Sequence, residues 1–486
     1  MKKVLITGML ILITTLRTFP EEPKGILEWS FTGELGLAPS VLDGNPAIYD
    51  KINTSAFYNY GFFSFLGDVS LINDKKYSPA EDYWLGHYFY PAQGGIFLDF
   101  ELLSLQAGRF YQTDVIDSPY SLIISSMKLP ALFVDTTFHL GRFTYTSRWV
   151  VLNTRSSEKP PDYPDGYPDR GMNYKIFALQ FDDLRVGLQD VVIYVDYVFD
   201  PEYFLSPVPD AIVQLYRKQG KPWSEYTNDN IVMALFAEWS KPNYYLYAQW
   251  LLDDINLDFL IPGFLRDVLG DNQIPQKMAW SLGGTYDFSF GRLGFYHAGA
   301  TKYTFSPATN YAEYPYQYTY YPAMWYQLKD GTTLPLDYRD NYIGYMYGEN
   351  NLAFLVDFTR TFGSVTLNAD LEYVVSGSKS PANPWHQYLS KDEAGRDTKL
   401  LDDSVLEHTA TAGIAAAWSL GRLTLFTKLR FGGVFNKLEL NGLVTPEDGG
   451  PAIFQPERGN DQLVYQLAAG ASYTFGSAGA EARTRQ

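Results

Sequence analysis

Apolar and polar side chains alternate along most of the chain. In residues 26–37, Leu27, Trp29 and Phe31 are interleaved with polar residues. The same period of two recurs in residues 364–375, 422–431 and 463–475. Because successive side chains of a strand point to opposite faces, this pattern predicts strands with one apolar and one polar face. Segments of about 10 residues match the length of a tilted strand that crosses a bilayer.

The connections between these strands alternate between short and long. Short turns are expected at Leu66-Gly67, Ser104, Leu140-Gly141, Asp182-Asp183, Lys241-Pro242, Phe290-Gly291, Phe362-Gly363 and Leu420-Gly421. Long connections are expected near 38–54, 74–94, 114–130, 153–172, 199–229, 255–277, 306–349, 376–404 and 441–462. Outer-membrane barrels show this rhythm, with tight periplasmic turns and longer extracellular loops. We therefore predict an all-β fold, a transmembrane antiparallel barrel of about 18 strands (range 16–18). A soluble all-β array of several domains is the alternative.

A barrel in a membrane turns its apolar set of side chains toward lipid. A charge on that face costs roughly 2–4 kcal/mol at the bilayer midplane, so the polar set is expected to point inward. The charged residues predicted to line the lumen are Glu28, Glu34, Asp99, Glu101, Arg148, Asp370, Glu372, Lys428 and Arg430.

The N-terminus has the composition of a secretory signal peptide. Lys2 and Lys3 precede an apolar run from Val4 to Leu16, which is shorter than the roughly 20 residues of a membrane helix. We predict a signal peptide over 1–19, although Arg17 and the missing small-residue cleavage motif leave a buried first helix as the alternative. The barrel is then expected over 26–475, and 476–486 form a periplasmic tail. The predicted location is the outer membrane of a Gram-negative-type bacterium.

Two partners of the barrel follow from this location. One is the outer-membrane lipid bilayer. The other is the barrel-assembly machinery, because the last strand ends at Phe475 like the terminal aromatic residue that this machinery reads.

Charge and composition exclude several functions. The chain has a formal net charge of −17, so nucleic acid is not an expected partner. It has no cysteine, and its five histidines lack the spacing of a metal or catalytic motif. We therefore predict no enzyme activity and no cofactor. Asp253 and Asp254 are a weak calcium candidate, and solvated loop carboxylates are the favoured interpretation.

One connection is unusually apolar. The segment DSPYSLIISSMKLP, residues 117–130, is too apolar for an exposed loop. It is expected either to fold into the lumen or to lie along the rim as a short helix capped by Asp117 or Ser118.

The longest connection is rich in tyrosine. Its segment YAEYPYQYTYYPAMWYQ covers residues 311–327. Phenol rings stack on the C–H faces of sugars while their hydroxyls form hydrogen bonds, which suits glycan binding. The candidate glycan-binding residues are Tyr316, Tyr318, Tyr320, Tyr321, Trp325 and Tyr326. The structural alternative is an aromatic belt that stiffens long loops.

The order of segments resembles the Wzi-type capsule-assembly outer-membrane proteins. The resemblance rests on LQAGRFYQTD, the apolar segment followed by PALFVDTTFHLGRFTYTSRWVVLN, ALQFDDLRVGLQDVVIYVDYVFDPEYFLSPV, NDNIVMALFAEWSKPNYYLYAQWLLDDI and YTFSP. It implies an 18-stranded barrel that binds or anchors a surface or capsular polysaccharide. The alternatives are a porin for small solutes and a purely structural or adhesive barrel.

Overall fold

The computed structural model describes most of the chain beyond the N-terminus. The described residues are 25–39, 45–74, 85–154, 166, 168–218, 229–254, 276–305, 318–321, 325–327, 333–379, 398–441 and 453–476. The predicted signal peptide and residues 477–486 of the predicted tail lie outside them.

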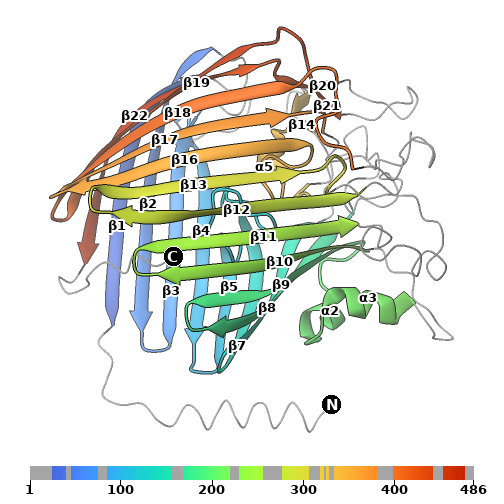
Figure 1. Ribbon diagram of the computed structural model, residues 1–486. Coiled ribbons are helices and arrows are strands. Elements are labelled where there is room, and N and C mark those ends of the chain that lie inside the picture. The colour runs from blue at the N-terminus through green and yellow to red at the C-terminus, as the bar shows by residue number, and fades with distance from the viewer. Residues whose placement is uncertain are drawn as a thin grey trace.

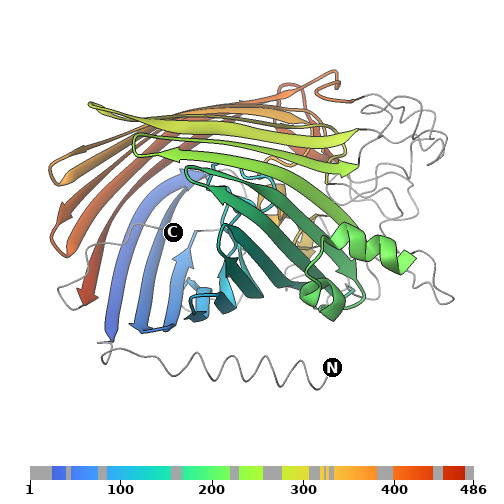
Figure 2. The same ribbon diagram turned by 60° about the horizontal axis from the view of Figure 1, so that its bottom comes forward.

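Eighteen antiparallel strands form one closed sheet (Figures 1 and 2). Their bounds are β1 Ile26–Pro39, β2 Pro46–Tyr60, β3 Phe63–Asn73, β4 Tyr88–Asp99, β5 Leu103–Tyr111, β6 Pro130–Leu140, β7 Phe143–Asn153, β8 Arg170–Phe181, β9 Leu184–Val195, β10 Asp229–Lys241, β11 Tyr244–Asp254, β12 Lys277–Phe288, β13 Gly291–Ala300, β16 Asn351–Phe362, β17 Val365–Ser376, β18 Glu407–Leu420, β19 Leu423–Phe435 and β22 Gln462–Gly476. The first strand, β1, pairs with both β2 and β22, so the sheet has no free edge. The predicted fold class is confirmed.

The outer wall is apolar, as the alternation predicts. Leu27, Leu35 and Leu371 are 57%, 60% and 64% exposed, whereas Glu34 and Glu372 point to the inside. These side chains are exposed in the structure, and a closed barrel in a membrane turns this face to hydrocarbon. Their partner is lipid.

Short turns and long connections alternate along the chain and lie at opposite ends of the barrel (Figure 1). Six predicted turns lie within one residue of observed turns. The first two are wrong: Leu66-Gly67 lies inside β3, and Ser104 lies inside β5. The first observed turn is at 61–62, where Gly61 has a φ of 58°, a conformation that glycine adopts without strain. The predicted 38–54 connection is correspondingly short, because β1 and β2 extend into it.

Smaller elements lie in the long connections between the barrel strands. They are the helices α2 (Pro201–Leu205), α3 (Asp210–Lys218) and α5 (Tyr338–Asn341), and the two-stranded pairs β14 (Trp325–Gln327) with β15 (Thr333–Pro335) and β20 (Leu438–Asn441) with β21 (Ile453–Pro456). Among the described residues, no helix is long and apolar enough to cross a bilayer.

Candidate functional site in the barrel lumen

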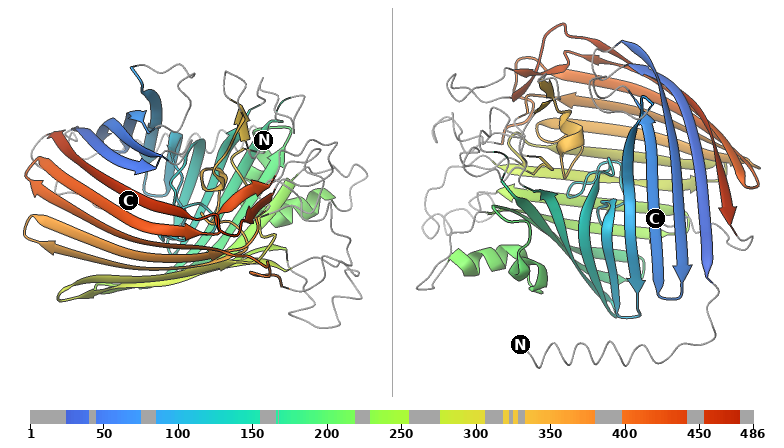
Figure 3. Two further views of the ribbon diagram at one scale, coloured as in Figure 1. Left: turned by 90° about the horizontal axis from the view of Figure 1, so that it is seen from above. Right: turned by 180° about the vertical axis from the view of Figure 1, so that it is seen from behind.

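The apolar segment after β5 folds into the lumen (Figure 3). Leu122, Ile123 and Ile124 are at most 1% exposed. The Tyr120 hydroxyl donates to Glu372 on β17, and the Leu122 amide donates to Gln249 on β11. The inward fold is therefore confirmed. The alternative of a short helix along the rim is wrong, since residues 112–129 adopt turns, bends and irregular backbone.

Asp114 anchors this segment to the inner wall. Its carboxylate accepts hydrogen bonds from the side-chain amides of Gln189 on β9, at 2.5 Å, and Gln249 on β11, at 3.2 Å. It also accepts the backbone amides of Ile123 and Ile124 at 2.9 and 3.0 Å. One carboxylate thus satisfies buried donors from both the wall and the segment itself.

A second segment packs on the first. The Ser125 amide donates to the Ile343 carbonyl at 2.6 Å, and the Tyr345 amide donates to the Leu122 carbonyl at 3.1 Å. An added Cβ on Gly344 would lie 2.5 Å from the Leu122 carbonyl oxygen, so this contact requires glycine. We call residues 112–129 and 341–350 together the plug.

The tyrosines of the long connection divide between interior and surface. Tyr318 and Tyr320 are 1% and 7% exposed, and Tyr321 is 51% exposed. The Tyr318 hydroxyl donates to the Ile123 carbonyl at 2.8 Å, and the Tyr320 hydroxyl accepts from Gln112 at 2.9 Å.

Burial raises the pKa of the Tyr318 phenol far above its usual value, so it stays a neutral donor. Tyr318 and Tyr320 therefore support the plug rather than present a surface. Tyr316 and the side chains of Trp325 and Tyr326 lie outside the described part of the structure.

The side of the lumen filled by the plug is dry. Arg148 on β7 pairs with Asp135 on β6 at 2.8 Å, and each side chain is only 10% exposed. The guanidinium also donates to the Thr113 carbonyl of the plug.

Asp253 forms a buried ion pair at the extracellular end of β11. It lies 3.0 Å from Lys277, with both side chains fully buried, and it accepts the Phe305 amide. This corrects the interpretation of Asp253 as a solvated loop carboxylate and gives its charge a protein partner in place of calcium. The Asp254 side chain is outside the described residues, which contain no group of three or more potential metal ligands.

The opposite side of the lumen is wet. In the ring of eighteen strands, β22 stands opposite β9, where the plug is anchored. Next to β22, the inward-facing side chains of Lys428 and Arg430 on β19 are 50% and 38% exposed. An inward-facing cation that is half exposed must be in contact with water inside the barrel.

Ion pairs run along this wet side at mid-height. Lys428 lies 3.1 Å from Glu34 on β1, and Arg430 lies 2.9 Å from Asp370 on β17. The hydroxyl of Tyr49 on β2 donates to Glu34 and accepts from Gln466 on β22. We call Glu34, Tyr49, Asp370, Glu372, Lys428, Arg430 and Gln466 the wet-side residues.

Glu372 joins the wet side to the plug. Its Oε1 accepts from the hydroxyls of Tyr120 and Tyr347, both at 2.8 Å, and its Oε2 lies 3.8 Å from Arg430. The plug therefore borders the wet side with two phenols.

The other predicted lumen charges lie near the end with the short turns. Glu28 alternates with the exposed Trp29 near the start of β1. Asp99 is the last residue of β4 and accepts from Ser104. Glu101 lies in the turn at 100–102, closed by hydrogen bonds between Phe100 and Leu103, which corrects its predicted place on a strand.

Sequence reasoning missed the residues that hold the plug and complete the wet side. Asp114 lies in the predicted 114–130 connection with no sign of its role, and Tyr49 lies on β2 although the sequence predicts a connection over 38–54. Gln249 stands between the apolar Ala248 and Trp250, so the alternation identifies it as a lumen residue, whereas Gln189 is followed by the polar Asp190 and the alternation does not decide its face. Nothing local marks them as partners of Asp114.

A closed antiparallel barrel with an apolar outer wall and a polar interior defines the class of outer-membrane β-barrels. This chain has that architecture. No family model and no curated protein matches its sequence.

Solved structures show the same fold. Wzi of Escherichia coli, described as an outer-membrane protein involved in group 1 capsule assembly and as a carbohydrate-binding barrel, has a TM-score of 0.50 and 10% identity, covering 97% of this chain and 88% of its own. OccK2 of Pseudomonas aeruginosa has a TM-score of 0.47 and 8% identity over 94% of this chain and 99% of its own. OpdQ of Pseudomonas aeruginosa has a TM-score of 0.47 and 10% identity over 93% and 99%. At 10% identity the likeness to Wzi extends to the fold and not to the family.

Proposed function

We propose that this barrel passes small polar or charged solutes along the wet side of its lumen, without catalysing a reaction. The observation that supports this function is the exposure of inward-facing charges at mid-height. Lys428 and Arg430 are 50% and 38% exposed although they point away from lipid. A purely structural barrel has no need of hydrated charges in its centre.

The ion pairs of the wet side suit transient binding. Partly exposed pairs contribute only about 0–1 kcal/mol each, so an anionic solute can displace Glu34 from Lys428 or Asp370 from Arg430 at little cost. Hydroxyl groups of the solute find partners in Tyr49 and Gln466. The buried Arg148–Asp135 pair, at 10% exposure, stays intact and holds the plug in place. Selection then depends on charges that bind a solute weakly enough to release it.

Planar-bilayer recordings test this function. The purified barrel is expected to conduct ions. The double variant Lys428→Gln with Arg430→Gln is expected to be more cation-selective, which is measured as a shift of the reversal potential in a salt gradient. The matched control is Lys437→Gln, which removes an exposed cation beyond the extracellular end of β19 and leaves selectivity unchanged. A wild-type barrel that inserts and does not conduct would overturn the proposal.

Binding of a surface polysaccharide is the second candidate function. It is supported by the exposed ring of Tyr321 beside the tyrosine-rich segment, where Tyr316, Trp325 and Tyr326 supply further candidate rings. Wzi, which shares the fold, is described as carbohydrate-binding. In this proposal Tyr318 and Tyr320 hold the base of the segment rather than contact sugar.

Retention on immobilised polysaccharide separates the two functions. The double variant Tyr321→Ala with Trp325→Ala is expected to lose retention, while Tyr321→Phe, which keeps the ring face, retains it. An unretained wild-type protein that conducts counts against glycan binding and for solute passage.

A further inference from the structure

The lipid-facing wall carries one polar row that breaks the apolar pattern. Ser147 on β7 stands opposite Lys175 on β8, and Lys175 stands opposite Asp190 on β9. Their sequence neighbours Arg148 and Gln189 contact the plug inside the barrel, so this row faces outward. Bare charges here would meet hydrocarbon.

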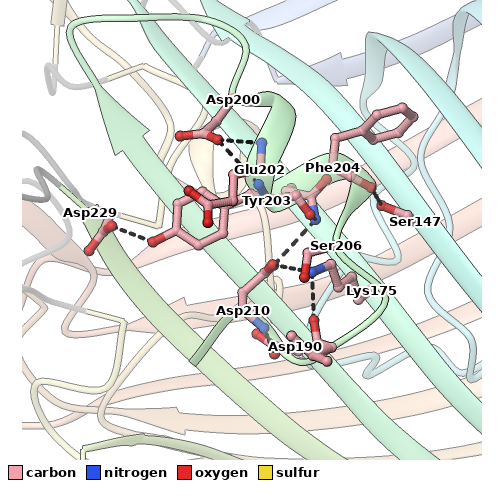
Figure 4. A network of polar contacts seen from close by, with 12 residues as sticks. Ser147, Lys175, Asp190, Asp200, Glu202, Tyr203, Phe204, Ser206, Asp210 and Asp229 are labelled. Carbon is pink, nitrogen blue, oxygen red and sulfur yellow. Dashed lines mark hydrogen bonds and ion pairs between the residues drawn. The ribbon is translucent and has the colours of Figure 1, made fainter. Parts of the chain in front are cut away.

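A helical segment covers this row from outside (Figure 4). Lys175 forms an ion pair with Asp210 of α3 at 2.6 Å, and both side chains are fully buried. The Lys175 ammonium also donates to the Val208 carbonyl at 2.7 Å, and the Ser147 hydroxyl donates to the Phe204 carbonyl at 2.8 Å. We call residues 199–218, which include α2 and α3, the outer cap.

The outer cap has a small core of its own. Val192 and Tyr194 of β9 pack against Tyr203 of α2 and Val213 of α3, and all four are at most 4% exposed. Arg217 closes the cap with two hydrogen bonds to Asp200, both at 2.8 Å. The cap is thus fastened to the barrel wall by charge and by packing.

The orientation of α3 is opposite to that of a helix in water. Of its charged residues, the two whose side chains the structure describes, Asp210 and Arg217, are buried, at 0% and 7% exposure. Its outward face consists of Ile212, Leu215 and Tyr216, at 53%, 53% and 57% exposure. A surface helix in water buries its apolar stripe and exposes its charges. The reversed arrangement indicates that the medium around the cap is apolar.

The apolar face of the cap is continuous with the lipid-facing wall. Between the cap and the end of β8 at the short turn, Leu179 and Phe181 are exposed at 42% and 44%. Beside it, Leu132 of β6 and Leu235 of β10 are exposed at 51% and 50%. The covered Lys175 lies near the middle of β8, so the cap extends from mid-height toward the extracellular end of the strands. That is the level of the outer leaflet.

We propose that the outer cap is embedded in the outer leaflet, with Ile212, Leu215 and Tyr216 in contact with lipid acyl chains. The cap replaces an apolar wall surface with an apolar helix surface and keeps the buried Lys175–Asp210 pair away from lipid. This interaction surface is independent of what the lumen carries.

Spin labelling tests the embedding directly, because the chain has no cysteine of its own. Leu215→Cys and Ile212→Cys are labelled separately in the full-length barrel in phosphatidylcholine–phosphatidylglycerol vesicles. Accessibility to oxygen, which concentrates in lipid, is compared with accessibility to a water-soluble nickel chelate. Leu371→Cys on the open wall is the lipid reference, and Lys437→Cys is the water reference.

The two cap sites are expected to match the oxygen-to-nickel ratio of Leu371→Cys. A ratio equal to that of Lys437→Cys would place the cap in water and overturn the proposal. Low accessibility to both reagents would mean that a second copy of the chain covers the cap, and this result also overturns it.

Discussion

Replacing Asp114 with alanine is expected to release the plug from the wall. The Asp114 carboxylate accepts the buried amides of Ile123 and Ile124, and it accepts the side-chain amides of Gln189 and Gln249. After the substitution the two glutamines keep other partners, because Gln189 still donates to the Tyr174 hydroxyl and Gln249 still donates to Gln189. The two backbone amides lose their acceptor, and so does the more weakly bound amide of Ile116, which donates to Asp114 at 3.3 Å.

The expected cost follows from those two amides. A buried donor left without an acceptor costs about 1–3 kcal/mol, so the pair costs about 4 kcal/mol. Because each 1.4 kcal/mol corresponds to a factor of ten, the population with a detached segment rises by roughly three orders of magnitude. Detachment opens the dry side of the lumen to water and leaves the strands paired.

Single-channel conductance measures this change. Asp114→Ala is expected to show larger and noisier conductance than the wild type. The thermal unfolding temperature of the barrel is expected to stay unchanged, because the strands remain paired. Asp117→Ala is the matched control, because Asp117 belongs to the same segment and is exposed. If Asp114→Ala conducts like Asp117→Ala, the carboxylate does not hold the plug and the reasoning fails.

Three further predictions probe the wall, the plug and the extracellular loops. Leu371→Arg is expected to lower barrel stability in vesicles by about 2–4 kcal/mol relative to Leu371→Ala, measured by urea unfolding, because the side chain faces lipid at 64% exposure. Gly344→Ala is expected to separate the plug layers and raise conductance, whereas Gly33→Ala, where an added Cβ meets nothing within 4 Å, leaves it unchanged. Burial raises the pKa of Asp403, but Lys302 and hydrogen bonds from Ser378 outweigh it and hold that pKa below its usual value. The stabilisation from Asp403 is therefore present above about pH 4 and lost as the pH falls through the lowered pKa; amide exchange of the loops should rise there in the wild type and stay level in Asp403→Asn.

The period-two pattern was sufficient to predict the barrel. Alternation depends only on which solvent each face of a strand meets, and that information is local. It predicted Leu371 outward and Asp370 inward, and the structure shows both. The first two turns are predicted at the wrong positions, because β1 to β4 contain polar and glycine-rich stretches that interrupt the alternation. Leu66-Gly67 has turn composition and nevertheless continues a paired strand.

The contents of the lumen required the tertiary structure. Asp114 meets Gln249 across 135 residues of sequence, and Tyr120 meets Glu372 across 252. No local pattern selects such partners, because any inward polar residue satisfies the same alternation. The plug also decides which lumen charges are dry, such as Arg148, and which stay hydrated, such as Lys428.

The outer cap also shows what the sequence determines and what only the tertiary structure decides. By itself, the sequence predicts strands in this region with their polar side chains inward, whereas Lys175 of β8 and Asp190 of β9 lie on the lipid-facing side. Only the tertiary structure decided that α3 folds back over this face and pairs Asp210 with Lys175. The physical reason is that a charge is buried only where another segment, distant in sequence, supplies the opposite charge. The alternation that predicts a strand, in contrast, lies within the strand itself.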